Sequence, residues 1–308
     1  MLSVELSNLQ PTKTEEKGYV IDYYFCNVDD FCKSFEKIEE RKMIEVKGRK
    51  QFVRKSSMEL SDMMTIMIYF HHSGYKNFKH YYERLVQDEL RTAFRNLVSY
   101  NQFIGMMTQM ILPLYTFTLM HMQGKNTGLS FIDSFSLPVC HNKRIYSHKV
   151  FKGLAQRGKT SMGWFYGFKL HLITNHVGEI VSFAITKGNI SDGNMTKNLA
   201  QNLEGFLFGD KGYLSNKTTS DLLKQGLHLI TKVRTNMKPK PISKTTKFLL
   251  YRRGIIETIF GQLKEFQHLV HTKYRSITGY FTNILSALIA YTLNPTKPRV
   301  ALNRVGVA

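Results

Sequence analysis

Cysteine, tryptophan and acidic side chains are scarce in this sequence of 308 residues, and each shortage carries information. The three cysteines, Cys26, Cys32 and Cys140, are odd in number and do not form the disulfide framework of a small secreted protein. No basic segment followed by an apolar one opens the chain, since residues 1–20 are polar and mixed in charge. These features predict a protein of the reducing cytoplasm.

Several common kinds of site are also absent from the sequence. There is no glycine-rich nucleotide loop and no nucleophile-elbow motif, and Cys26 and Cys32 lack zinc-site spacing with the neighbouring histidines. The 19 residues of Ile104–Met122 contain no Lys, Arg, Asp or Glu, but polar residues and Pro113 interrupt them. We therefore expect this run, like Ile277–Leu293, to form a buried helix that does not span a membrane.

Acidic residues are depleted mainly in the second half of the chain. Residues 1–128 contain 17 Lys/Arg and 15 Asp/Glu, whereas residues 129–308 contain 26 and 8, and the formal net charge is +20. Such a positive field attracts polyanions and favours DNA or RNA as the partner. A basic surface kept for solubility is the alternative. An anionic membrane surface is less favoured, because no strongly basic amphipathic helix stands out.

The first 123 residues read as mainly helical. Residues 1–57 are charged and irregular or partly helical, with weak periodicity over Val28–Ile44. Residues 58–123 predict a helical domain whose first helix is capped by Ser61 or Asp62. Further helices are expected over Asn77–Gln87, Asp88–Ser99 and Gln102–His121. Such short helices suit either a helix-turn-helix-like DNA-binding unit or a small bundle that packs on its neighbour.

The periodicity changes after a linker-like segment at residues 123–128. Residues 129–293 predict a strand, a β-hairpin turning at His176-Val177-Gly178, and then alternating helices and strands. A basic loop over Arg234–Arg253 and a long helix over Arg253–Leu269 follow, and residues 294–308 form a tail. The order predicts an α/β domain with a mixed sheet flanked by helices.

Five of the eight acids in the basic half have ordinary interpretations. Asp192 stands where a helix N-cap is needed, and Glu179 follows the hairpin glycine. The other three, Glu204, Asp221 and Glu265, lie at predicted helix positions with no distinguishing context.

Three acids remain as candidates for chemistry. Asp133 lies among apolar residues of a predicted strand, Asp210 follows the strand Phe206–Phe208, and Glu257 lies among apolar neighbours on a helix. A carboxylate in such surroundings is costly unless something compensates it. In a strongly cationic protein, three of them indicate ligands for a divalent metal such as Mg²⁺ that acts in phosphoryl transfer.

Four motifs together resemble one family. They are Phe131-Ile132-Asp133-Ser134, Gly163-Trp164-Phe165-Tyr166-Gly167-Phe168-Lys169-Leu170-His171, Gly209-Asp210-Lys211-Gly212-Tyr213 and Ile256-Glu257. The chain resembles the DDE transposases of bacterial insertion sequences, of the family nine-eight-two type, over roughly residues 60–292. Arg253, Glu257 and Lys264 also follow the spacing of the family's signature around its glutamate. The signature's tyrosine would fall at Leu250, whereas the tyrosine here is Tyr251.

The resemblance implies an RNase H-like catalytic domain that cleaves DNA and joins it to a target. It implies Asp133, Asp210 and Glu257 as catalytic residues and metal ligands, with Mg²⁺ or Mn²⁺, as two ions, as the cofactor. Terminal inverted repeats and target DNA would be the partners of a homodimer or higher oligomer in a bacterial cytoplasm, associated with the nucleoid. A nuclease of the same fold without strand transfer, and an inactive DNA-binding descendant, are the alternatives.

Basic residues around these acids are candidates for DNA contact. Arg253 and Lys264 lie near the helix face of Glu257, and Lys211 follows Asp210 directly. The remaining candidates are Arg144, Lys149, Lys169, Lys238, Lys240 and Lys244. Lys169 and His171 share a strand face directed either to the site or to solvent. Trp164, the only tryptophan, suits base stacking, but core packing is the favoured interpretation.

Overall fold

In this computed structural model, residues 13–46, 57–121, 124–232, 243–265, 267–270 and 275–302 are described. The chain divides into two compact units, Met1–Leu114 and Tyr115–Ala308, with the division inside one helix. Lys238 and Lys240, two of the predicted DNA contacts, lie outside the described residues.

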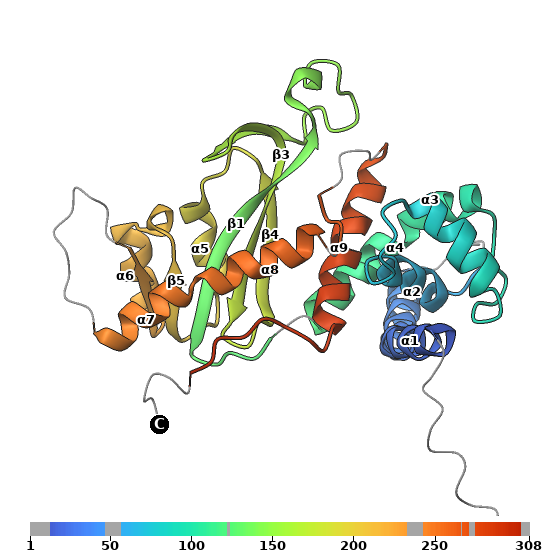
Figure 1. Cartoon of the computed structure of the whole chain (residues 1–308), viewed down its shortest axis with the longest axis horizontal. Helices are drawn as coiled ribbons and strands as arrows, with labels where there is room; N and C mark the ends of the chain where they lie inside the picture. The colour runs from blue at the N-terminus through green and yellow to red at the C-terminus, as the bar shows by residue number, and fades with distance from the viewer. Residues whose placement is uncertain are drawn as a thin grey trace, which may run out of the picture. The chain divides into compact units, whose positions relative to one another are not determined.

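The first unit is helical (Figure 1). Its elements are α1 (Lys13–Val46), α2 (Leu60–Phe70), α3 (Phe78–Tyr81), a π-helical segment η1 (Tyr82–Glu89) and α4 (Tyr100–His121), which continues into the second unit. α1 is longer than the periodicity of Val28–Ile44 indicates. No helix covers residues 90–99, so the predicted helix Asp88–Ser99 is wrong apart from its first two residues. α4 contains Pro113 and is long and apolar enough to cross a membrane, a test that core helices of soluble proteins also pass.

The second unit is built on one mixed sheet. Its strands are β1 (Leu129–Cys140), β2 (Gln156–Thr160), β3 (Gly163–Asn175), β4 (Ile180–Lys187), β5 (Gly205–Gly209) and β6 (Leu227–Thr231). β3 pairs antiparallel with β1 along one edge and with β2 and β4 along the other. β1, β5 and β6 are parallel neighbours. This order confirms the mixed sheet predicted for residues 129–293.

The helices of the second unit surround this sheet. They are α5 (Asp192–Leu199), α6 (Asn216–Lys224), α7 (Lys244–Arg252), α8 (Gly254–Glu265) and α9 (Ile277–Leu293), with short 3₁₀ turns η2 (Asn142–Arg144) and η3 (Lys211–Tyr213). Serine side chains accept hydrogen bonds from backbone N–H groups at the starts of α6, α7 and α9. α7 occupies part of the predicted basic loop, so residues 244–252 are a helix there. α9 is a buried helix, as predicted.

The two faces of the sheet carry different helices. Ile132, Ile173 and Leu207 share one apolar cluster with Leu199 of α5 and Leu222 of α6. On the other face of β1, the ring of Phe135 lies 4.7 Å from that of Phe260 on α8, and Figure 1 shows α8 running across β1. Side chains alternate along a strand, so neighbouring residues of β1 meet different helices. This alternation places Asp133 with α8 and Ser134 with α5.

Candidate functional site

Strand register brings Asp133 and Asp210 level with each other. β1 and β5 are parallel neighbours in which Phe131 pairs with Phe208. Asp133 and Asp210 each lie two residues further along their own strand direction, and Asp210 continues beyond the end of β5 with extended backbone. Because side chains alternate along a strand, the Asp133 carboxylate lies on the α8 face, whereas Asp210 directly follows the end of β5 as the N-cap of η3. The structure thus places two of the predicted acids at one end of adjacent strands.

Glu257 reaches the same region through an arginine. The Nη1 atom of Arg253 donates to Oδ2 of Asp133 at 3.0 Å, and its Nη2 atom donates to Oε1 of Glu257 at 3.0 Å. Arg253 lies between α7 and α8, one turn before Glu257. The arginine therefore links the strand acid to the helix acid. Glu265, the other acid of α8, is exposed at the last residue of that helix.

Burial dominates the electrostatics of Asp133. It raises the pKa of this carboxyl, whereas the Ser134 N–H bonded to Oδ1 at 2.8 Å and the Arg253 guanidinium lower the pKa, and the negative charge of Asp192 raises it further. The ammonium of Lys264 lies 4.7 Å from the centre of the Phe135 ring. Burial lowers the pKa of Lys264, and Asp133 raises it. Asp133 is therefore a carboxylate whose charge calls for nearby cations.

The three acids Asp133, Asp210 and Glu257 are chemically suited to a hard cation, since Mg²⁺ prefers the oxygen ligands of Asp and Glu carboxylates. Yet no three His, Cys, Asp or Glu side chains among the described residues lie close enough to hold a metal ion. Arg253 engages one oxygen of Asp133 and one of Glu257 in this arrangement. The side chain of Glu257 is 61% exposed, so it has room to turn away from Arg253.

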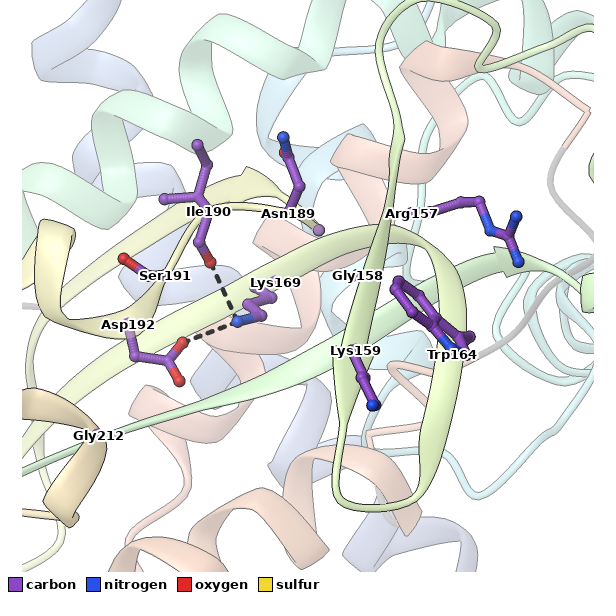
Figure 2. A pocket seen from close by; sticks show the side chains of 11 residues that line it. Arg157, Gly158, Lys159, Trp164, Lys169, Asn189, Ile190, Ser191, Asp192 and Gly212 are labelled. Carbon is purple, nitrogen blue, oxygen red and sulfur yellow. Dashed lines mark hydrogen bonds and ion pairs between the residues drawn. The ribbon is translucent and has the colours of Figure 1, made fainter. Parts of the chain in front are cut away.

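The α5 face carries a separate polar cluster around Asp192. Oδ1 of Asp192 accepts a hydrogen bond from Ser134 Oγ at 2.7 Å. It also accepts one from Lys169 Nζ at 3.1 Å, and Lys169 donates to the Ile190 carbonyl as well (Figure 2). The interpretation of Asp192 as a helix cap is wrong. Ser191 is the N-cap of α5, and no side chain caps this helix. Asp192 instead compensates a buried lysine.

His171 belongs to the same cluster and is fully buried. Its Nε2 lies 2.8 Å from Thr186 Oγ1, and its Nδ1 lies 3.9 Å from Asp192 Oδ1. Burial lowers the pKa of His171 to about 4, although the charge of Asp192 opposes the shift. His171 is therefore neutral at pH 7. Lys169 and His171 face the protein interior, on the side of the sheet away from Asp133.

The sequence alone does not predict this cluster. Ser134, Lys169 and His171 are polar residues at buried or half-buried strand positions, and that pattern calls for an acidic partner. β1 and β3 pair Ser134 with His171 and Ser136 with Lys169, so one face collects all three polar groups. The register that does so comes from strand pairing, which the sequence pattern leaves open.

The other predicted DNA contacts lie at the surface. Arg144 in η2, Lys149 after it, Lys211 in η3 and Lys244 at the start of α7 are exposed. Near the family signature, Leu250 is buried and Tyr251 is 81% exposed. The exposed cations stay predicted DNA contacts, and Tyr251 is available to a ligand in a way that Leu250 is not.

A family profile described as a transposase DDE domain matches residues 123–277, half of the chain. The chain belongs to the DDE transposase family. The matched region contains every strand of the sheet together with α5 to α8. It therefore includes all three acids that the sequence predicts as catalytic. Among curated proteins, no sequence matches this one.

Two solved transposase structures resemble this DDE transposase. A cryo-EM structure of a piggyBac transposase synaptic complex with hairpin DNA is 12% identical and has a TM-score of 0.50, covering 80% of this chain and 68% of that one. A crystal structure of the Mos1 strand transfer complex is 10% identical with a TM-score of 0.21, covering 92% and 96%. The similarity to the piggyBac structure shows a shared fold, whereas the TM-score of the Mos1 structure is too low to show one.

Proposed function

We propose that this DDE transposase hydrolyses phosphodiester bonds at the ends of an insertion sequence and joins the freed ends to target DNA, with a divalent metal as cofactor. The observation that carries the proposal is the level placement of Asp133 and Asp210, with Glu257 linked to Asp133 through Arg253. The DDE family match over these residues supports it.

Asp133, Asp210 and Glu257 would hold the metal. Mg²⁺ or Mn²⁺ ions, when bound, activate an attacking oxygen and stabilise the leaving one in phosphoryl transfer. Asp133 is suited to this role because burial has already removed much of its water, so a cation gains from its charge. For Glu257 to join, its exposed carboxylate leaves Arg253, which keeps its second contact with Asp133.

The basic residues of the second unit would hold the DNA. Lys211 is exposed directly after Asp210, and its ammonium would neutralise a phosphate of the bound DNA. Arg144, Lys149 and Lys244 add exposed cations on three other segments. Such contacts set affinity and register without reading bases. The synaptic assembly of the piggyBac neighbour supports a dimer or higher oligomer on paired ends.

A cleavage and joining assay tests the proposal. The substrate is a pair of DNA fragments that carry the element's terminal inverted repeats, with one set uncut and another set pre-cut to expose the 3′-hydroxyl. With Mg²⁺ and a target plasmid, we expect cleavage of the first set and joining of the second. Asp210→Asn should lose both activities. Asp221→Asn, which changes a surface acid paired with Lys197, is the matched control and should retain them.

Three results would contradict parts of this proposal. Cleavage of uncut ends without joining of pre-cut ends identifies a nuclease of the same fold. Binding without either reaction identifies an inactive DNA-binding descendant. If Asp210→Asn processes DNA in Mg²⁺ as the unaltered protein does, Asp210 is not a metal ligand. Calorimetric titration with Mn²⁺ gives a readout independent of activity, because Asp133→Asn and Asp210→Asn should each weaken metal binding.

A further inference from the structure

The only tryptophan of the chain is held at the surface on a cationic hairpin. Trp164 is 54% exposed, so the core packing favoured from the sequence is wrong. β2 and β3 form this hairpin, with Lys159 opposite Trp164 and Arg157 opposite Tyr166. The alternation of side chains puts Arg157, Lys159 and Trp164 on one face.

Two cations flank the indole. The guanidinium carbon of Arg157 lies 5.5 Å from the ring centre, and the Lys159 ammonium lies 5.7 Å from it. In the part of the chain that the structure describes, neither cation makes an ion pair, and residues 134–178 contain seven Lys/Arg and no Asp or Glu. The hairpin thus offers an aromatic face beside positive charge that no acid of its own neutralises.

The hairpin forms one wall of an open pocket of about 490 Å³. Figure 2 shows Trp164, Arg157 and Lys159 on one side, and the Lys169–Asp192 pair with the loop Asn189–Ser191 on the other. The lining also includes Gly212, two residues after Asp210. The pocket therefore extends from the exposed indole to the Lys169–Asp192 pair, which lies on the side of the sheet away from Asp133.

The position of the hairpin is fixed by glycines. A Cβ added to Gly158 would lie 2.1 Å from the Gly188 carbonyl oxygen, and one added to Gly188 would lie 2.7 Å from the Gln156 carbonyl oxygen. Only glycine allows the two backbones to approach so closely. Trp164 is thus carried by a strand pair anchored against the pocket's opposite loop, which gives it a defined place.

We propose that this pocket takes one unpaired nucleotide of a bound DNA strand, with its base stacked on Trp164 and its phosphate held by Arg157 or Lys159. An exposed aromatic ring with nearby cations suits single-stranded nucleic acid, because every base has a π-face and every nucleotide a phosphate. A base within a duplex has both faces covered by its neighbours, so the nucleotide must be unpaired. The pocket volume lies within the range of small-ligand sites.

This inference rests on the proposed function, but its test does not require catalysis. Because Trp164 is the only tryptophan, the fluorescence of the full-length protein, excited where tyrosine does not absorb, reports on this ring alone. The protein is titrated in EDTA with a single-stranded DNA oligonucleotide and with an abasic oligonucleotide of equal length and charge. We expect the first to quench the emission and the second to bind with little quenching.

Binding by variants supplies the second measurement, with labelled single-stranded DNA followed by polarisation. Trp164→Ala should weaken binding by about tenfold or more, and Trp164→Phe should restore part of the loss. Tyr115→Ala, which removes an aromatic side chain that is 46% exposed on α4, is the matched control and should bind as the unaltered protein does. Thermal unfolding checks that each variant is folded.

The outcomes separate this inference from the proposed function. Equal quenching by both oligonucleotides, or unchanged binding by a folded Trp164→Ala variant, overturns the stacking role even if the protein cleaves DNA in Mg²⁺. Conversely, base-dependent quenching in a protein that neither cleaves nor joins DNA supports the pocket and contradicts the proposed catalysis.

Discussion

The two faces of the central sheet use similar residues in opposite ways. On the α8 face, Asp133 is ion-paired with Arg253, and the carboxyl pKa is raised because burial outweighs the favourable contacts. On the α5 face, Asp192 satisfies Ser134 and the buried Lys169 directly. Asp133 and Ser134 are adjacent in sequence, so strand alternation alone assigns them to different roles. A bound cation would stabilise the charge of Asp133 on the α8 face, whereas Asp192 on the α5 face already stabilises the fold through its contacts with Ser134 and Lys169.

The sharpest test changes these two neighbours separately. Asp133→Asn should lower cleavage and joining by about a thousandfold or more, since a metal contributes several kcal/mol to the transition state. Its thermal stability should change little, because the cost of burying the carboxylate is removed while Arg253, whose side chain is 15% exposed, loses one of its two carboxylate partners. Assays of joining and thermal unfolding measure the two effects.

Ser134→Ala is the matched change on the opposite face. It should keep activity within a few-fold and cost about 1 kcal/mol of stability, the value of one hydrogen bond to Asp192. If Ser134→Ala were as inactive as Asp133→Asn, the division of the sheet into a catalytic and a structural face would be wrong.

Low pH should reduce the free energy of unfolding, because His171 on the α5 face is buried as a neutral side chain. A group whose folded pKa is lowered contributes stability that is present above its unfolded pKa of 6.5 and is lost as pH falls through the folded value of about 4. The loss should reach about 3 kcal/mol by pH 4. Denaturant unfolding measured from pH 7 to pH 4 checks it.

Comparison with His171→Gln isolates the contribution of His171 to the loss of stability in acid. That variant should show a flatter pH profile over the same window, with Asp192, Lys169 and Thr186 still facing the site. Parallel profiles for the two proteins would mean that other groups cause the acid loss.

Asp192→Asn should act on stability more than on the chemical step. It leaves Lys169, whose side chain is 11% exposed, without its ionic partner and should cost about 1–3 kcal/mol. Asp221→Asn breaks an ion pair with the 65% exposed Lys197 and should change stability much less, because solvent screens exposed ion pairs. Chemical denaturation compares the two variants, and equal losses would contradict the structural role of Asp192.

The smallest stability effect is expected at Glu257. Its ion pair with Arg253 is largely exposed, so Glu257→Gln should change the free energy of unfolding by about 0.5 kcal/mol or less. The same variant should nevertheless lose cleavage, whereas Glu265→Gln should keep it. Retained cleavage in Glu257→Gln together with loss in Glu265→Gln would show that the wrong glutamate was chosen.

The fold class and the family follow from the sequence and are confirmed. The sequence predicts the alternation of strands and helices, the hairpin at Gly178 and the apolar helix α9. Each of these depends on local periodicity and turn chemistry. β2 was not recognised, because its run of Gln156, Arg157, Gly158, Lys159 and Thr160 lacks β-branched and apolar residues except for its last residue. It is a strand because β3 pairs with it.

The three predicted acids stay predictions as a catalytic set, although the structure shows how they relate. The sequence by itself determined which acids lack an ordinary role and where the positive charge is concentrated, because composition and local pattern suffice for both. Only the tertiary structure decided that Arg253 joins Asp133 to Glu257, that Asp192 serves Lys169, and that Trp164 is exposed between two cations. Each of these depends on strand register and helix placement, which bring together side chains that are up to 120 positions apart.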